Sequence, residues 1–103
     1  MTAPLAETPQ PRIQIVQLDV IAADQLAVVA RCLGSTRLGA EFRCPDHDGE
    51  TVDLIVTEIR RYPQVTVREV QPPHAARLIL TGGHASRLRL RPRDVLRGKN
   101  PAA

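Results

Sequence analysis

Aromatic residues are almost missing from this chain of 103 residues, which has one Phe, one Tyr and no Trp. Val, Leu, Ile and Ala must therefore fill any core, and β-branched side chains suit a pleated, half-buried surface. The shortage also argues against the usual readers of single-stranded RNA, which offer several aromatic platforms for base stacking. Only Tyr62 and Phe42 can serve that purpose here.

Long apolar runs are missing as well, since no segment approaches the roughly 20 residues that cross a bilayer. Residues 1–11 have neither a basic start nor an apolar stretch, so we expect no export signal and no membrane contact. The two cysteines are then expected to be reduced thiols of a cytoplasmic protein. A phosphate loop of the form Gly-x-x-x-x-Gly-Lys-Ser/Thr is also absent, so we expect neither GTP nor another cofactor.

The dominant hydrophobic period is two, which predicts strands, and no stretch shows a convincing helical period. We expect eight short strands, over residues 12–20, 26–33, 40–44, 51–59, 65–68, 76–81, 87–91 and 94–96. Many short strands at regular spacing predict an all-β domain, a small closed antiparallel barrel of Greek-key type. The barrel is expected over residues 12–97, between a disordered segment (1–11) and a flexible tail (98–103).

The strand patterns also predict which side chains face inward. The expected core residues are Val28, Leu54, Val56, Leu78, Leu80, Leu88 and Leu90. In the first strand the inward face is expected to switch at a bulge, because apolar residues occupy both alternations. In residues 51–59, Ile55 and Ile59 are expected to face away from Leu54 and Val56. Asp48-Gly49 predicts a hairpin turn ahead of that strand, since both residues tolerate a positive φ.

Charge is unevenly spread along the chain. Residues 1–73 carry seven Arg against ten acids, a net charge of −3, whereas residues 74–103 carry six Arg and Lys99 against Asp94, a net charge of +6. Arg87, Arg89 and Arg91 alternate with leucines, which predicts a strand with an outward stripe of arginine. Such a stripe can meet an acidic partner, and a surface of mixed charges is the simpler alternative.

One cluster carries the residue types of a reactive site. Cys44 and His47 lie three positions apart, and a hairpin centred near Leu38 would bring Cys32 roughly opposite Cys44. Zinc would need a fourth ligand, and a cysteine nucleophile would need a lowered pKa and an oxyanion hole. Two buried thiols beside an Asp-rich turn explain the pattern more simply. We therefore expect no metal site and no enzymatic activity.

Four segments share an order and a spacing with a known family. VVARCLGSTRLGAEFRC (28–44), ETVDLIVTEI (50–59), ARLILTGG (76–83) and RPRDVLRG (91–98) together resemble the second domain of translational GTPases of the elongation factor Tu type. The resemblance implies a small β-barrel over residues 12–97, here without the GTPase domain. The family usually has Gly where this chain has Pro73 and Arg93. In the family this barrel helps hold the aminoacylated end of tRNA, partly through a basic pair at the place of Arg60 and Arg61.

These observations favour a stand-alone, non-catalytic binding module. The leading interpretation is a regulatory or accessory protein that acts by protein–protein contact. The alternative is a translation-associated protein that binds RNA, tRNA or the ribosome through its arginines. The candidate contact residues are Arg60, Arg61, Arg87, Arg89 and Arg91.

Overall fold

The computed structural model describes residues 10–45, 49–62 and 64–102. The described residues form nine strands: β1 (Arg12–Ala22), β2 (Gln25–Gly34), β3 (Thr36–Arg37), β4 (Glu41–Pro45), β5 (Thr51–Arg61), β6 (Val65–Thr66), β7 (Glu69–Val70), β8 (Ala75–Thr81) and β9 (Val95–Lys99). A single turn of 3-10 helix, η1 (Ala85–Arg87), precedes β9. In the part of the chain that the structure describes, no helix has the length and apolar character to span a membrane.

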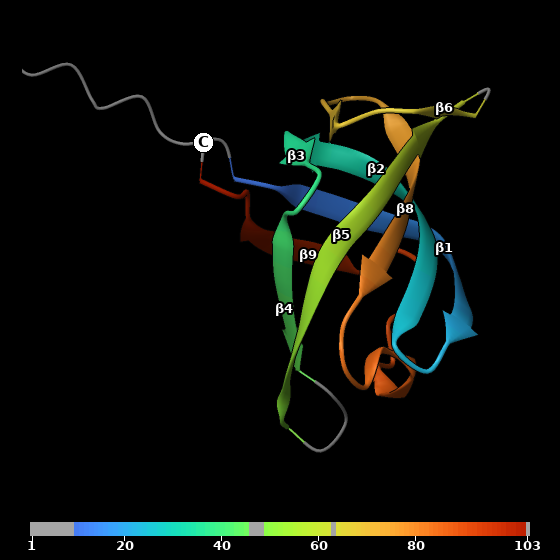
Figure 1. Cartoon of the computed structure of the whole chain (residues 1–103), viewed down its shortest axis with the longest axis vertical. Coiled ribbons are helices and arrows are strands. Elements are labelled where there is room, and N and C mark those ends of the chain that lie inside the picture. The colour runs from blue at the N-terminus through green and yellow to red at the C-terminus, as the bar shows by residue number, and fades with distance from the viewer. Residues whose placement is uncertain (1–9, 46–48, 63, 103) are drawn as a thin grey trace, which may run out of the picture.

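Six strands close into an antiparallel barrel in the order β4-β9-β1-β2-β8-β5, and the ring is completed by the pairing of β5 with β4. Strands β4, β5 and β8 lie side by side, and β9 returns to lie beside β4, which is a Greek-key order. Figure 1 shows β5 crossing the front of the barrel, with β1 and β9 behind it. The predicted all-β closed barrel is therefore confirmed.

A bulge in β1 explains its double apolar pattern. Ile15 pairs with Ala30 and Gln17 with Val29, so Val16 is the extra residue. Ile15 is buried, whereas Val16 is 53% exposed, and beyond the bulge Leu18 packs against the core. The predicted switch of the inward face is confirmed, because one extra residue shifts the alternation by one position.

A second bulge, which lies in β5, was not predicted. The register against β8 shifts between Val56 and Glu58, which leaves Thr57 as the extra residue. Val56 is buried ahead of the bulge and Ile59 is buried after it, while Ile55 is 42% exposed. The expectation that Ile59 faces outward with Ile55 is therefore wrong, since the bulge returns Ile59 to the core.

The core is aliphatic around one aromatic side chain, Phe42, which is fully buried. Leu90 is partly buried against this core. The other residues predicted for the core are all buried: Val28, Leu54, Val56, Leu78, Leu80 and Leu88.

The segment before β9 differs from its prediction. Residues 87–91 form no strand, because η1 ends at Arg87 and an irregular stretch follows. Before the stretch, Ser86 N of η1 donates to Ala23 O (3.2 Å), just after the end of β1, and at its far end Arg93 N donates to Ile15 O of β1 (2.6 Å). Pro92 has no N–H to add to a ladder between these points. The Leu-Arg alternation therefore reports the burial of the leucines and not strand pairing.

The barrel also extends past the predicted boundaries. Strand β9 continues to Lys99, so the segment predicted as a tail contains the residues that close the barrel. Asn100 is tied down as well, since its Nδ2 donates to Ser35 O and its Oδ1 accepts from Arg37 N, both at 2.9 Å. At the other end Pro11 is buried and its carbonyl accepts from Gly98 N. Gln10 is exposed, and residues 1–9 of the predicted disordered segment lie outside the described residues.

The hairpin between β4 and β5 is present, with the last pair formed by Pro45 and Thr51. Gly49 has the positive φ (83°) that the turn prediction requires. Its predicted companion, Asp48, lies outside the described residues. The Pro45–Thr51 pair leaves residues 46–50 between the strands, which is more than the two residues of the turn that the sequence predicts.

Candidate functional site

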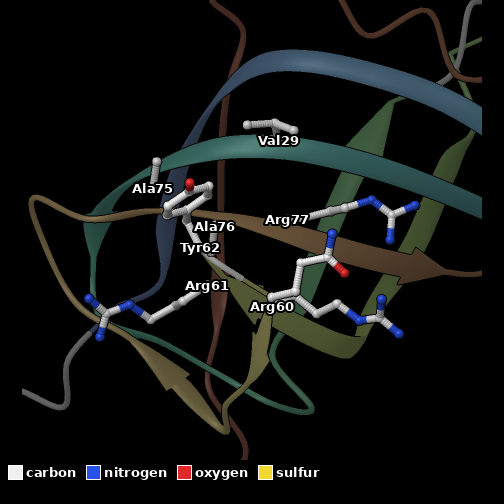
Figure 2. Close-up of a pocket in the computed structure, with 8 residues that line it drawn as sticks. Val29, Arg60, Arg61, Tyr62, Ala75, Ala76 and Arg77 are labelled. Atoms are coloured by element: carbon white, nitrogen blue, oxygen red, sulfur yellow. The ribbon is translucent and has the colours of Figure 1, made fainter.

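A surface pocket of about 520 Å³ lies at the end of β5, beside β8 (Figure 2). Its apolar side chains are Val29, Ala75 and Ala76. Its rim carries Arg60, Arg61, Tyr62 and Arg77. The volume falls within the range of roughly 300–1,000 Å³ that is typical of small-ligand sites.

Strand pairing brings the basic residues together. Arg60 of β5 lies directly opposite Arg77 of β8, and Arg77 lies directly opposite Val29 of β2. Opposite residues of an antiparallel pair project from the same face of the sheet. The Thr57 bulge puts Arg60 on this face, because uninterrupted alternation would turn residue 60 inward with Val56. Figure 2 shows the Arg60 and Arg77 side chains extending in the same direction.

The pocket keeps much of its positive charge. Arg60 is partly neutralised by Glu58, whose Oε1 accepts from Nε and lies 3.0 Å from both Nε and Nη2 of the guanidinium group. Within the described residues, the side chains of Arg61 and Arg77 have no ion-pair partner. Like charges directly opposite across two strands destabilise a sheet. Glu58 offsets part of this repulsion at Arg60, and an anion between Arg60 and Arg77 would be attracted by both groups.

Tyr62 follows directly after the last residue of β5 and is 95% exposed. Its ring lies beside Ala75 and Ala76 in Figure 2. The chain then turns back, with Gln64 N donating to Arg61 O at 2.7 Å and Arg61 pairing with Val65 of β6. The Arg61–Gln64 hydrogen bond therefore fixes the backbone of Arg61 beside the pocket, and Tyr62 lies at its edge.

The structure separates the predicted contact residues into two groups. Arg60 and Arg61 line the pocket, whereas Arg87 lies on η1 and Arg89 and Arg91 lie on the irregular stretch after it. These last three side chains are exposed but form no strand stripe. Arg89 lines a different pocket beside β4 and β9.

Arg77 is the functional candidate that the sequence prediction missed. The alternation in residues 76–81 places it on the outward face, and that much can be read from the sequence. Its partnership with Arg60 depends on the order of strands in the barrel and on the Thr57 bulge. The order of the strands is not visible in the sequence pattern, and the only local sign of the bulge is the apolar Ile59 out of alternation with Val56.

The cysteines do not form the expected pair. Strand β2, which carries Cys32, pairs with β1 and β8, while β4, which carries Cys44, pairs with β5 and β9. Cys32 Sγ lies within hydrogen-bond distance of Gly34 O (3.0 Å) and Val70 O (3.2 Å), either of which can accept its single proton. The hairpin that was expected to place the two thiols opposite each other is therefore wrong, because β3 and the following turn carry the chain across the barrel.

Burial raises the pKa of both thiols, and that of Cys44 rises to about 11. A raised pKa disfavours the thiolate form that a cysteine nucleophile needs. His47 lies outside the described residues. Among the residues that the structure describes, no group of three or more His, Cys, Asp and Glu side chains could hold a metal ion.

No family model, curated protein or solved structure matches the chain. The structure therefore shows a small all-β protein with a closed six-stranded antiparallel barrel, and no family is identified. Because a barrel of this kind can host unrelated functions, the function depends on the residues of the pocket and not on the fold.

Proposed function

We propose that the protein is a non-catalytic binding module that binds RNA through the pocket at the end of β5. The observation that carries the proposal is the arrangement of three arginines around one pocket, with Arg60 and Arg77 directly opposite each other.

Arginine suits phosphate because its planar guanidinium group can donate two parallel hydrogen bonds. The chain's net charge of +3 adds a general attraction for polyanions. The sequence resemblance of residues 12–97 to the second domain of translational GTPases points to the same Arg60–Arg61 pair. It supports a translation-associated role in the cytoplasm, which stays a prediction.

The test is the affinity of a fluorescently labelled RNA oligomer, measured by anisotropy over a series of salt concentrations. Affinity should fall as salt rises, since phosphate binding releases counterions. Arg77→Ala should weaken binding several-fold and reduce the slope of log affinity against log salt by about 0.7 if one phosphate contact of a single strand is lost. The matched control is Arg87→Ala, which removes an exposed arginine outside the pocket.

Three results would decide the matter. If RNA affinity falls with Arg77→Ala and is unchanged with Arg87→Ala, RNA binding at the pocket is supported. Equal loss with both variants would mean that RNA binds by overall charge and not at this site. Absence of RNA binding at low salt would refute the proposal.

A second observation favours the alternative of protein–protein contact. A groove of about 730 Å³ adjoins the pocket, shares Arg77 with it, and is partly apolar. Ile21 and Leu38 line this groove and are 48% and 39% exposed. Apolar surface of this kind is typical of interaction sites of regulatory or accessory proteins. A protein partner should remain bound through a high-salt wash and be lost with Ile21→Ser but not with Arg60→Ala.

A further inference from the structure

We propose that the pocket selects single-stranded RNA, with one base stacked on Tyr62 and the neighbouring phosphates held by the surrounding arginines. This inference rests on the proposed function, because it requires RNA to enter this pocket. It adds which form of RNA binds, and by which group a base is held.

The exposure of Tyr62 is the first reason. It is 95% exposed, while the next most exposed large hydrophobic residue among those described, Val20, is 55% exposed. The chain's only other aromatic residue, Phe42, is fully buried. One aromatic ring therefore serves the core, and the other stands in solvent at the rim of a basic pocket. An exposed aromatic ring offers a face on which any base can stack.

The placement of the arginines is the second reason. In Figure 2 the Arg61 guanidinium group extends to one side and the Arg60 and Arg77 groups to the other, while the Tyr62 ring lies near Ala75 and Ala76. A nucleotide within a strand has a phosphate on both its 5′ and 3′ sides. A base stacked on Tyr62 would therefore place one phosphate toward Arg61 and the next toward the Arg60–Arg77 pair.

This arrangement discriminates between forms of RNA. Bases of a duplex are already paired and stacked on their neighbours, so a duplex offers the arginines its phosphates but cannot offer Tyr62 a free base face. A free mononucleotide offers a base but only one phosphate position. A single strand is the form that satisfies both sides of the pocket at once.

The composition of the chain supplies a direct assay. Tyr62 is the only tyrosine and there is no tryptophan, so the intrinsic fluorescence of the protein reports this pocket alone. We expect a short adenine-rich single strand to quench that fluorescence, because stacking brings a base onto the ring. The same sequence as a duplex should leave it nearly unchanged, and AMP at equal nucleotide concentration should quench far less. A parallel titration of N-acetyltyrosinamide corrects for absorption by the bases.

Two variants separate stacking from charge. Tyr62→Ala should weaken single-strand binding by about tenfold in the anisotropy assay, within the range measured for loss of one base–aromatic stack. Tyr62→Phe keeps the ring and should bind within about twofold of the parent protein. Because Tyr62 is 95% exposed, both variants should keep the thermal stability of the parent, which a melt followed by circular dichroism verifies.

The outcomes distinguish this inference from the proposed function. If the single strand binds but leaves Tyr62 fluorescence unchanged and tolerates Tyr62→Ala, the stacking inference is wrong while RNA binding stands. If the duplex binds as tightly as the single strand, the proposed preference for single-stranded RNA is wrong. If AMP quenches as strongly as the oligomer, the site is a mononucleotide site. If no RNA binds, both proposals fall.

Discussion

Replacing Gly98 by Ala should open the barrel between β4 and β9. Gly98 lies opposite Phe42 in the pairing of these two strands. A Cβ atom at residue 98 would collide with the carbonyl oxygen of Glu41 and lie 2.9 Å from Cδ1 of Phe42. The obstacle is backbone on a paired strand together with the buried ring of Phe42, so β4 and β9 must separate to admit even a methyl group.

The cost has two parts. Forcing a methyl group against a packed core costs about 1–3 kcal/mol. Weakening the hydrogen bonds between β4 and β9 adds about 1 kcal/mol for each bond lost. We therefore expect the free energy of unfolding to fall by roughly 2–4 kcal/mol. For a domain of this size that loss lowers Tm by on the order of 10–20 °C.

The assay is urea denaturation followed by far-ultraviolet circular dichroism. Gly83→Ala is the matched control, because a Cβ at residue 83 would meet nothing within 4 Å. Its free energy of unfolding should change by less than about 0.5 kcal/mol. If Gly98→Ala is as stable as the parent protein, β9 does not close against β4 and residues 98–103 are the tail that the sequence suggests.

Three further predictions concern the core, a strained residue and a buried thiol. Leu54→Asp should unfold the domain in circular dichroism, because it buries an unpaired charge at a fully buried position, and a folded variant would contradict the inward face of β5. Arg93 has a φ of 80°, a conformation that glycine adopts without strain, so Arg93→Gly should raise the free energy of unfolding by roughly 0.5–1 kcal/mol. A loss of stability in urea would show that the arginine side chain matters more than its backbone strain. Burial raises the pKa of Cys44 from 9.0 to about 11, so the unfolded thiol ionises first and stability should fall as pH rises from 9 to 11. Denaturation curves of Cys44→Ala should show a smaller fall over that interval.

Much of the barrel can be predicted from alternation alone. The inward positions of Leu54, Leu78 and Leu80 follow from a period of two, and the double pattern in residues 12–20 predicts the bulge at Val16. These features are local, so they depend only on residues that are close in the chain. The closed barrel then follows from the number and spacing of the strands.

The errors occur where the answer depends on distant pairing. Alternation in residues 87–91 predicts a strand, but these residues have no continuous strand partner and form a 3-10 turn and an irregular stretch. Residues 98–100 resemble a tail because their partners, Phe42 and Ser35, lie more than fifty positions away. The polar sequence of this end carries no sign of those contacts.

Two of the three arginines of the candidate site can be identified from the sequence. Arg60 and Arg61 are adjacent, and the family resemblance marks their place. Arg77 joins them only because β8 pairs with β5 and because Thr57 shifts the register by one residue. The change of apolar alternation between Val56 and Ile59 is a local sign of this bulge, but it does not say which strand pairs with β5.

The most direct test of the central claim is the affinity of one labelled single-stranded RNA oligomer for the parent protein, Arg77→Ala and Arg87→Ala at a single low salt concentration. Arg77→Ala removes one of two opposed like charges, so it should not destabilise the sheet, and a loss of affinity reports binding and not unfolding. The account predicts several-fold weaker binding for Arg77→Ala and parent affinity for Arg87→Ala. Equal affinity of all three proteins would contradict the assignment of the pocket as the RNA site.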